Sequence, residues 1–423
     1  MKDTRNAAPR RGEPHDLLRA LPAPVPIDCV ILGGGAAGLW TLDELVRSGR
    51  SAMLLEANEL GRGQTVAAQG IIHGGFKYTL RGLLTSSASN IAAMPTVWRA
   101  CLAGERPPEL EGTRIRAHAC HLWQTRSLVS AIGMIGARAG LRVTPAPLDR
   151  DSRPPELRDC PGTVARIDEQ VIDPVSLLHD LSGRHRERIL RIDARSGLEL
   201  RCEGPGRVRT ISLINPDSGD VLDLAPAAVV FAAGVGNAGL REMAGLDPQT
   251  MQRRPLHMTM VRGELPYLNG HCVDGARTRV TITSALDHRE RTVWQIGGQL
   301  AEDGVSMDAP MLVERAAEEL DAVLPGVDLH DAEWATYRVD RAEAATTGGL
   351  RPDDAQVVGP SGGNVLTVWP TKLALVPRLA ELILAQLPEA DPARRICGPI
   401  GADFPRPMVA LAPWDAAEQW VRR

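Results

Sequence analysis

A short apolar run that ends in a glycine-rich turn constrains the fold of this chain more than any other feature. The apolar composition of Ile27–Leu32 predicts a buried strand, and the turn Gly33-Gly34-Gly35-Ala36-Ala37-Gly38 follows it directly. Ala36–Ser48 then has apolar residues at helical spacing, and Ser51–Leu55 is a second apolar run. Strand, glycine turn, helix and strand in this order predict a βαβ unit that binds the phosphates of a dinucleotide.

Each glycine of the turn has a physical task in such a unit. Gly33 lets the chain turn sharply out of the strand, Gly35 leaves space where a pyrophosphate approaches the backbone, and Gly38 lets the helix pack closely on the sheet. The backbone N–H groups of Ala36 and Ala37 lie at the helix N-terminus, where they are free to donate to phosphate oxygens. We therefore expect these five residues to bind the cofactor.

The end of the second strand carries an acidic residue, as the motif requires. Glu56 lies about 20 residues beyond the glycine turn, where a carboxylate accepts hydrogen bonds from the ribose hydroxyls of the adenosine. We expect its neighbour Ala57 to line the same site. A carboxylate at this position repels a 2′-phosphate, so NADP is disfavoured, but the turn alone does not separate NAD from FAD.

The composition of the chain excludes several classes of protein. Its 423 residues suggest two or three domains or one large two-lobed enzyme, and a net charge of −4 disfavours nucleic acid as a partner. Residues 1–26 are rich in Arg and Pro and predict a flexible tail, and no window reaches about 18 uninterrupted apolar residues, so we expect no transmembrane segment. The seven cysteines are scattered without a Cys-x-x-Cys pair, which favours reduced thiols in a cytoplasmic protein.

The segment that follows Glu56 resembles a known family. Residues 61–78 read Gly-Arg-Gly-Gln-Thr-Val-Ala-Ala-Gln-Gly-Ile-Ile-His-Gly-Gly-Phe-Lys-Tyr, which is similar to the flavin-covering segment of the D-amino-acid oxidase (DAO) superfamily. The Ile-His-Gly-Gly piece is most similar to L-2-hydroxyglutarate oxidases and FAD-linked glycerol-3-phosphate dehydrogenases. The resemblance implies FAD as the cofactor, with contacts from Thr65, Gln69, Gly70 and Gly74.

Three later stretches resemble the family in the same order. They are Val171-Ile172-Asp173-Pro174 before a helix, Ala228–Gly234 with its small-residue turn at Gly234, and 349–372 beside the flavin ring. The resemblance covers roughly residues 27–388. It implies an α/β protein with a discontinuous Rossmann-like FAD-binding domain and an antiparallel-sheet substrate domain. The boundaries we predict are a tail at 1–26, an FAD-binding domain at 27–110, 162–250 and 345–388, a substrate domain at 111–161 and 251–344, and a C-terminal tail at 389–423.

Two departures from the family pattern leave the substrate open. The family's small-residue-plus-His-Gly turn after the last strand is replaced here by Trp369-Pro370-Thr371-Lys372. The Gly-x-Arg-Pro pattern that binds a substrate carboxylate is blurred, because Arg338, Arg341 and Arg351 are all candidates.

Three residues are the candidates for catalysis. His73 could take the hydroxyl proton of an alcohol substrate as hydride leaves for the flavin N5, which favours a CH–OH substrate over an amine. Alternatively, His73 only contacts the flavin, bonds a backbone carbonyl, or is bonded covalently to the flavin. Lys372, at a helix expected to start near Thr371, could stabilise negative charge on the reduced flavin, or it is a solvated lysine.

An arginine on a predicted strand completes the catalytic set. Arg338 could form a bidentate pair with a substrate carboxylate, and strand alternation places Arg341 on the opposite face. Ion pairs of these arginines with Asp340 or Glu343 are the alternative. Lys77 and Tyr78 are weaker candidates for substrate contact. His118 and His121 lack a third ligand and point to opposite faces of a strand, so we expect no metal site.

The remaining elements follow from local patterns. Residues 255–300 alternate strands with turns and predict an antiparallel sheet of about three to five strands. Further strands are expected at Thr113–Trp123, Val221–Leu224 and Ala228–Ala233. Helices are expected at Ser127–Ala139, from Asp173 to about Arg188, at Pro310–Val323 and at Thr371–Leu387.

The function predicted from these features is FAD-dependent oxidation of a small hydroxy- or amino-acid-like substrate. The electron acceptor stays open among oxygen, a quinone and an electron-transfer protein. A flavin monooxygenase and an FAD-binding protein with a structural role are the alternatives. A pyridine-nucleotide disulfide reductase is disfavoured, because the chain has neither a redox Cys pair nor a second glycine loop.

Overall fold

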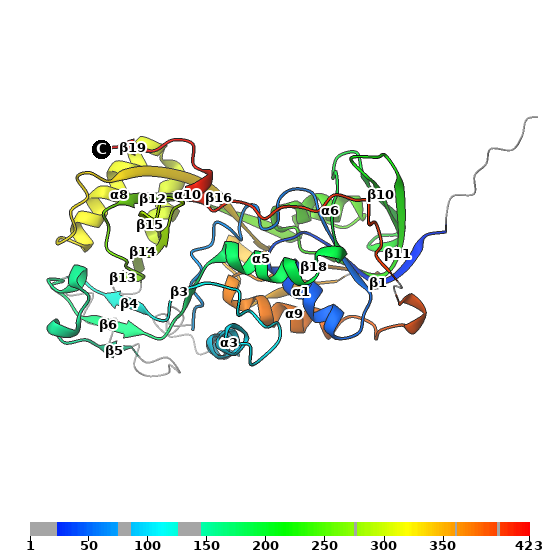
Figure 1. Cartoon of the computed structure of the whole chain (residues 1–423), viewed down its shortest axis with the longest axis horizontal. Coiled ribbons are helices and arrows are strands. Elements are labelled where there is room, and N and C mark those ends of the chain that lie inside the picture. Colours follow the sequence, from blue (N-terminus) through cyan, green and yellow to red (C-terminus); the bar gives the residue numbers. More distant parts are fainter. Residues whose placement is uncertain (1–22, 75–85, 126–144, 275–276, 360–361, 396–397) are drawn as a thin grey trace, which may run out of the picture.

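Two large β-sheets organise the molecule into two lobes (Figure 1). The computed structural model describes residues 23–74, 86–125, 145–274, 277–359, 362–395 and 398–423. The expected helix Ser127–Ala139 and the candidates Lys77 and Tyr78 lie outside these ranges.

The first sheet contains the predicted βαβ unit. Strand β1 (Val25–Leu32) pairs in parallel with β2 (Ala52–Glu56), and helix α1 (Ala36–Arg47) connects them. The strand begins at Val25, slightly before the expected start. The leucines that repeat at helical spacing in α1 are fully buried and hold the helix against the sheet: Leu39, Leu42 and Leu45.

Six strands of the first sheet form a continuous path with a hairpin beside it. Their order is β17 (Gln356–Val358), β18 (Val365–Trp369), β11 (Val221–Phe231), β1, β2 and β8 (Ile189–Arg191). Strand β10 (Arg207–Ile214) pairs with both β11 and β9 (Leu198–Gly204).

Strand β11 corrects one expectation. The sequence suggested two strands, Val221–Leu224 and Ala228–Ala233, but one strand spans both and ends at Phe231. Pro226 between them stays in register with Ile27 of β1. The first half pairs with β10 and the second with β1 and β18, so the strand continues through the proline although that residue donates no ladder hydrogen bond.

Among the described residues, the second sheet has nine strands. Their order is β19 (Val421–Arg422), β16 (Glu333–Ala344), β12 (Met251–Gly263), β15 (Thr292–Gly297), β14 (Arg277–Leu286), β13 (Gly270–Asp274), β4 (Cys120–Trp123), β6 (Val164–Ile167) and β5 (Ala146–Pro147). Four of these strands, β12 to β15, pair antiparallel within residues 251–297, which confirms the three to five strands expected there. Strands distant in sequence extend this local meander, and β13 pairs in parallel with β4. The expected strand Thr113–Trp123 is divided between β4 and β3 (Ile115–Ala117), which pairs with β7 (Val171–Ile172).

Helices cover both sheets. In the first lobe α1 packs with α5 (Pro174–Arg184) and α9 (Val376–Leu384), and α3 (Ser86–Leu102) lies beside them (Figure 1). In the second lobe α8 (Ala309–Val323), which the sequence predicted closely, buries its apolar face against Trp294 and Trp334. The shorter helices are α6 (Asn237–Met243), α7 (Gln299–Asp303) and α10 (Pro413–Ala416).

Two helix boundaries differ from expectation. The Asp173 carboxylate caps α5 by accepting from the Val175 N–H at 2.9 Å, and the helix ends at Arg184 rather than near Arg188. The helix expected from Thr371 begins as a 3₁₀ turn at Leu373–Leu375 and continues as α9. Thr371 has a left-handed φ of 61°, which prevents the helix from starting there.

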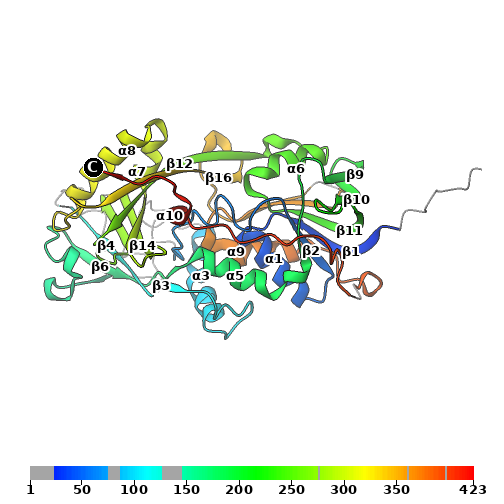
Figure 2. The same cartoon turned by 45° about the horizontal axis from the view of Figure 1, so that its top comes forward.

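The C-terminal residues are an ordered part of both lobes. Residues 405–423, the C-terminal strap, run along the outside of the molecule from the first sheet to the second (Figure 2). The Leu60 N–H donates to the Met408 carbonyl at 2.7 Å, and β19 at the far end pairs with β16. The Trp414 ring lies over the Arg116 guanidinium and the Trp420 ring over that of Arg262. The segment that the sequence left as a tail therefore joins the two lobes.

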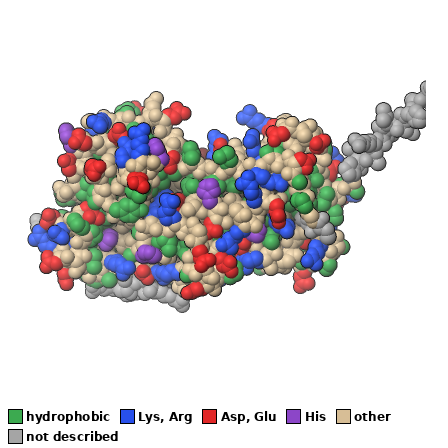
Figure 3. Space-filling view, viewed as in Figure 1, with side chains coloured by type: hydrophobic (Ala, Val, Ile, Leu, Met, Phe, Trp, Pro, Cys, Tyr) green, Lys and Arg blue, Asp and Glu red, His purple; other side chains and the backbone are tan. Residues whose placement is uncertain are grey.

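On the face drawn in Figure 3, acidic and basic side chains are interspersed, and neither sign of charge dominates.

Among the described residues, no helix has both the length and the hydropathy needed to cross a membrane.

Candidate active site and cofactor cavity

A cavity of about 720 Å³ opens at the carboxyl ends of the parallel strands of the first sheet. Its walls include the last residues of β1, β2 and β18 and the turn that follows β11, which is where α/β sheets bind ligands. Most of the predicted cofactor residues line it: Gly33, Gly35, Ala36, Ala37, Glu56, Ala57, Thr65 and Gly234.

The glycine turn lies at the N-terminus of α1, where the Ala36 N–H, expected to be free for a phosphate, donates to the Thr65 hydroxyl. A Cβ on Gly33, whose φ is 117°, would lie 2.5 Å from the Ala232 carbonyl oxygen, and a Cβ on Gly38 would lie 1.9 Å from that of Gly33. Both glycines are therefore needed for close packing of the backbone. Gly38 is not among the residues that line the cavity. At Gly35 the nearest atom to an added Cβ is the Thr65 hydroxyl oxygen at 3.1 Å, and the Ala36 N–H donates to that oxygen at 3.2 Å. A pyrophosphate fits this cradle at the N-terminus of α1.

Glu56 is held where a ribose would lie. Its Oε2 accepts from the Gly34 N–H at 2.6 Å, and its Oε1 accepts from the Asn58 N–H at 2.9 Å. Burial raises the pKa of this carboxyl above its ordinary value, while the backbone N–H groups oppose the shift. The carboxylate is thus fixed at the cavity wall, with acceptor positions suited to sugar hydroxyls.

Lys372 and Arg338 line the same cavity. Lys372 is half-buried and precedes the 3₁₀ turn that begins α9. The exposed Arg338 donates from its two terminal nitrogens to the Val305 and Met307 carbonyls, at 2.9 and 2.6 Å. These two bonds use two of the five guanidinium N–H groups and fix the direction of the side chain. Arg341 is directed elsewhere, to the Glu302 carboxylate at 3.1 Å.

Gln69, a predicted cofactor contact, is bonded to the second sheet. Its Nε2 donates to the carbonyls of Thr281 at 3.0 Å and Gln295 at 2.9 Å, which belong to β14 and β15. The Ala67 carbonyl accepts from the Gln295 side chain at 2.9 Å. This part of the flavin-covering segment thus ties the two lobes together, and Gln69 is not among the residues that line the cavity.

Gly70 and Gly74 also lie outside the cavity lining and shape the backbone around His73. Gly70 has a φ of 75°, and a Cβ there would lie 2.0 Å from the Ile172 carbonyl oxygen. The Ile172 N–H donates to the Gly70 carbonyl at 2.9 Å. The Gly74 N–H donates to Glu169 Oε1 at 2.7 Å. The segment that carries His73 is therefore paired with the chain just before α5.

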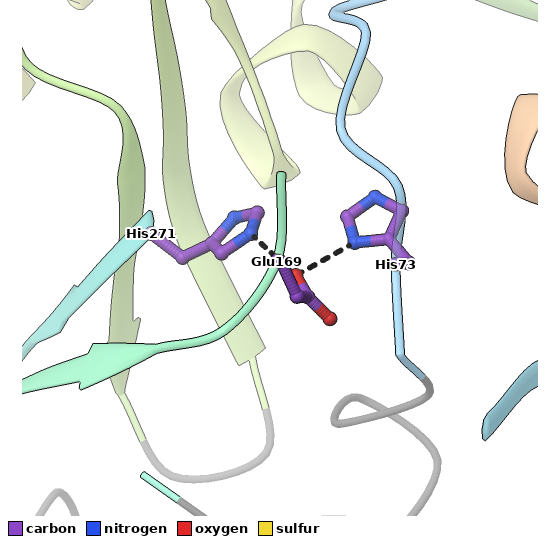
Figure 4. Close-up of side chains that lie close together, drawn as sticks. All are labelled: His73, Glu169 and His271. Carbon is purple, nitrogen blue, oxygen red and sulfur yellow. Dashed lines mark hydrogen bonds and ion pairs between the residues drawn. The ribbon is translucent and has the colours of Figure 1, made fainter. Parts of the chain in front are cut away.

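His73 belongs to a cluster with Glu169 and His271 (Figure 4). His73 Nδ1 lies 3.2 Å from Glu169 Oε2, and His271 Nε2 lies 3.8 Å from the same oxygen. The two imidazole rings are stacked with their centroids 5.7 Å apart. The side chains of Glu169 and His271 are each 2% exposed, whereas that of His73 is 25% exposed. His73 is thus the member of the cluster that solvent reaches.

The Glu169 carboxyl stays ionised although it is buried. Burial by itself would raise its pKa, but the His73 and His271 imidazoles outweigh that effect and hold the pKa well below its ordinary value. A buried anion between two imidazoles favours a positive charge on one of them.

The sequence did not predict the partners of His73. Glu169 stands close before the quoted Val171-Ile172-Asp173-Pro174 motif, and this position beside a family motif was the one available signal. His271 gave no signal. The ligand atoms of His73, Glu169 and His271 all lie within 4.8 Å of one another, so the described residues contain a group able to hold a metal ion that the sequence did not indicate. The catalytic candidates also do not all meet in one place, because Arg338 and Lys372 line the cavity and His73 does not.

Known proteins that are similar to this chain include FAD-dependent oxidoreductases. The chain is 38% identical over 404 residues to the probable FAD-dependent oxidoreductase PA4991 of Pseudomonas aeruginosa, covering 94% of this chain and all of that one. The crystal structure of PA4991 superimposes with a TM-score of 0.77 at 34% identity, over 93% of this chain and 99% of the other.

More distant solved structures share the fold. Glycine oxidase from Geobacillus kaustophilus has a TM-score of 0.60 at 17% identity, over 87% of this chain and 96% of its own. L-α-glycerophosphate oxidase from Mycoplasma pneumoniae, with FAD bound, has a TM-score of 0.60 at 14% identity, over 87% and 97%.

A family model described as FAD dependent oxidoreductase (DAO) matches residues 28–376. This match confirms the predicted fold class, FAD as the cofactor and the oxidoreductase class. The chain belongs to the DAO family of FAD-dependent oxidoreductases.

Proposed function

We propose that this protein oxidises the C–H bond beside a hydroxyl or amino group of a small acid-like substrate, with His73 as the base. The observation that carries the proposal is the 3.2 Å contact between His73 Nδ1 and the buried Glu169 carboxylate. A partly exposed imidazole held by a buried carboxylate is an arrangement suited to accepting a proton.

The residues of the cavity fit FAD. The N–H groups at the start of α1 would bind the pyrophosphate, the Glu56 carboxylate would bind the ribose, and Ala57 and Gly234 would line the adenosine side. When bound, FAD supplies the acceptor for the substrate hydride.

His73 supplies the proton chemistry that an alcohol substrate needs. As the C–H bond releases its electron pair as hydride, the hydroxyl proton passes to the imidazole and the carbon–oxygen bond becomes a carbonyl. A neutral amine reacts without such a base, so the presence of His73 favours a CH–OH substrate. The fold alone is compatible with both, because similar folds occur in proteins named as a glycine oxidase and a glycerophosphate oxidase.

Lys372 and Arg338 supply positive charge at the same cavity. We propose that Lys372 stabilises the negative charge that develops at the cofactor, since it is half-buried where the 3₁₀ turn before α9 begins. We propose that Arg338 binds a substrate carboxylate with the N–H groups that its two carbonyl contacts leave over.

Anaerobic bleaching of the purified yellow protein tests the proposal. Hydroxy acids, amino acids and glycerol phosphates are each mixed with the protein, and the loss of flavin absorbance is followed. We expect one hydroxy acid class to bleach the protein, and His73→Gln to slow the bleaching by about 10²-fold or more. His185→Gln is the matched control, because it removes an imidazole that pairs with a carboxylate, Asp43 of α1, at 2.9 Å and takes no part in the Glu169 cluster.

Two results would contradict the proposal. If no compound in the panel bleaches the flavin, a structural role for FAD becomes the better interpretation. If His73→Gln and His185→Gln bleach at the wild-type rate, His73 is not the base.

Reoxidation of the bleached protein by oxygen, a quinone or an electron-transfer protein then identifies the acceptor.

We also propose a cytoplasmic location. The six described cysteines are free thiols, as expected in a reducing compartment. Cell fractionation of an untagged protein tests this location.

A further inference from the structure

We propose that Glu169 is a positioning residue that fixes which ring nitrogen of His73 carries the proton. The inference rests on the proposed role of His73 as the base. A carboxylate accepts hydrogen bonds and cannot donate one. His73 Nδ1 faces Glu169 Oε2 at 3.2 Å, so the neutral imidazole carries its proton on Nδ1 and keeps the lone pair on Nε2.

The carboxylate binds the backbone and the ring of the His73 segment together. Oε2 contacts the imidazole, and Oε1 accepts from the N–H of Gly74 at 2.7 Å, the very next residue. The Glu169 side chain is almost fully buried, so it has little freedom to move away. Two contacts to neighbouring residues of one segment set both the position and the rotation of the imidazole.

His271 holds the carboxylate from the other side. Its Nε2 lies 3.8 Å from Glu169 Oε2, and its Nδ1 lies 2.9 Å from the Thr281 hydroxyl oxygen. The Thr281 carbonyl accepts from Gln69, which belongs to the His73 segment. The His73 and His271 imidazoles are the main groups that lower the Glu169 pKa.

This arrangement has a chemical consequence for His73. When Nε2 accepts a proton, the ring becomes an imidazolium whose charge lies next to the buried carboxylate, and the attraction stabilises that form. Glu169 does not itself take up the proton, since its pKa lies well below the ordinary range. It therefore sets the tautomer of the base and favours its charged form after the transfer.

Nitrogen NMR of the intact holoprotein tests the tautomer without any turnover. The protein is labelled with ¹⁵N in its histidine rings, and His73→Gln identifies the signals of His73. At a pH where the ring signals of His73 are those of a neutral imidazole, we expect the proton on Nδ1 in the wild type. In Glu169→Gln the preference is lost. A wild-type signal with the proton on Nε2 would overturn the proposal, whether or not a substrate has been found.

A pH profile of the bleaching rate provides the second test. Glu169→Gln should slow bleaching by about 10²-fold, with little change in KM. The part of the profile where the rate rises with pH, its rising limb, should also move to lower pH, because the negative partner of the imidazolium is gone. Glu169→Asp keeps the charge, so the limb should stay and part of the rate should return. Glu319→Gln is the control: this buried carboxylate pairs with Arg279 at 2.6 Å in the second lobe, and its loss should leave the limb in place.

Other outcomes separate the proposal from its rivals. A Glu169→Gln profile with an unmoved limb would overturn the positioning role and leave a structural one. About one equivalent of zinc in the purified protein, lost in both Glu169→Gln and His271→Gln, would also overturn it, because the cluster would then be a metal site. If Glu169→Gln fails to fold, the wild-type NMR signal alone decides. If His73→Gln bleaches normally, the proposed function fails independently of the tautomer.

Discussion

The Gly34 N–H donates to the Glu56 carboxylate over 2.6 Å and so joins the glycine turn to the end of β2. The carboxylate thereby holds the backbone of the turn in place. Its remaining oxygen lone pairs are available to accept hydrogen bonds in the cavity. In the proposed adenosine diphosphate site, one residue would therefore contribute to both halves.

Glu56→Gln should weaken FAD binding by about tenfold or more. An amide keeps the shape but loses the charge that strengthens hydrogen bonds from the turn and from the ribose. Titration of the apoprotein with FAD, followed by quenching of flavin fluorescence, measures the change. Glu59→Gln is the matched control, because Glu59 is on the same loop and is largely exposed. Equal affinities for all three proteins would contradict the assignment.

Gly35→Ala should separate cofactor binding from folding. A Cβ at Gly35 meets only the Thr65 hydroxyl and projects where the pyrophosphate would lie, so the protein should fold but bind FAD poorly. Gly33→Ala should instead impair folding, because its Cβ would lie 2.5 Å from a carbonyl at a φ of 117°. Gly183→Ala in α5 meets no atom within 4 Å and should keep both properties. Circular dichroism and bound flavin are measured for each; a colourless Gly183→Ala would undermine the comparison.

Gln69→Ala should loosen the contact between the lobes. The substitution removes two hydrogen bonds to strand carbonyls, at 3.0 and 2.9 Å, and should destabilise the holoprotein by about 1–3 kcal/mol. Urea unfolding measures the difference. Gln386→Ala, which removes an exposed 3.3 Å bond to the Leu382 carbonyl, should change stability by less than about 0.5 kcal/mol. The expectation fails if both variants unfold at the same urea concentration.

Lowering the pH should remove the stability that the ionised Glu169 carboxylate gives to the fold. A carboxyl whose pKa is lower in the folded than in the unfolded protein stabilises the fold above its unfolded pKa, about 4.3, and this stability is lost as pH falls toward the folded value. The stability difference between the wild type and Glu169→Gln should therefore shrink as pH is lowered from about 5 to 2. Thermal melting across that range measures it. A difference that stays constant would show that the carboxyl is not ionised in the folded state.

The sequence predicts the parts of the site that are close together along the chain. Gly33, Gly38 and Glu56 could be assigned because turn, helix and strand are consecutive, and backbone geometry alone requires those residue types. Glu169 and His271 could not be assigned. They meet only because β4 pairs with both β6 and β13, and no local pattern encodes that pairing.

One further error has a local physical cause. The helix expected at Thr371 starts later because that residue adopts a left-handed conformation, which periodicity does not reveal. The contact of Gln69 with the cofactor, implied by the family resemblance, stays a prediction. The bonds of its amide to two carbonyls of the second sheet could not be predicted, because they depend on how the lobes are packed.

The order of strands in the first sheet has a consequence for synthesis. Strand β1 leaves the ribosome well before its neighbour β11, which is translated some two hundred residues later, and β18 follows later still. Until then the β1 edge of the nascent chain can pair with other strands, and folding of the first lobe must wait or be protected by a chaperone. The C-terminal strap then joins lobes that are already formed. A ribosome that stalls before residue 365 would therefore release a chain without the strand that closes the flavin cavity.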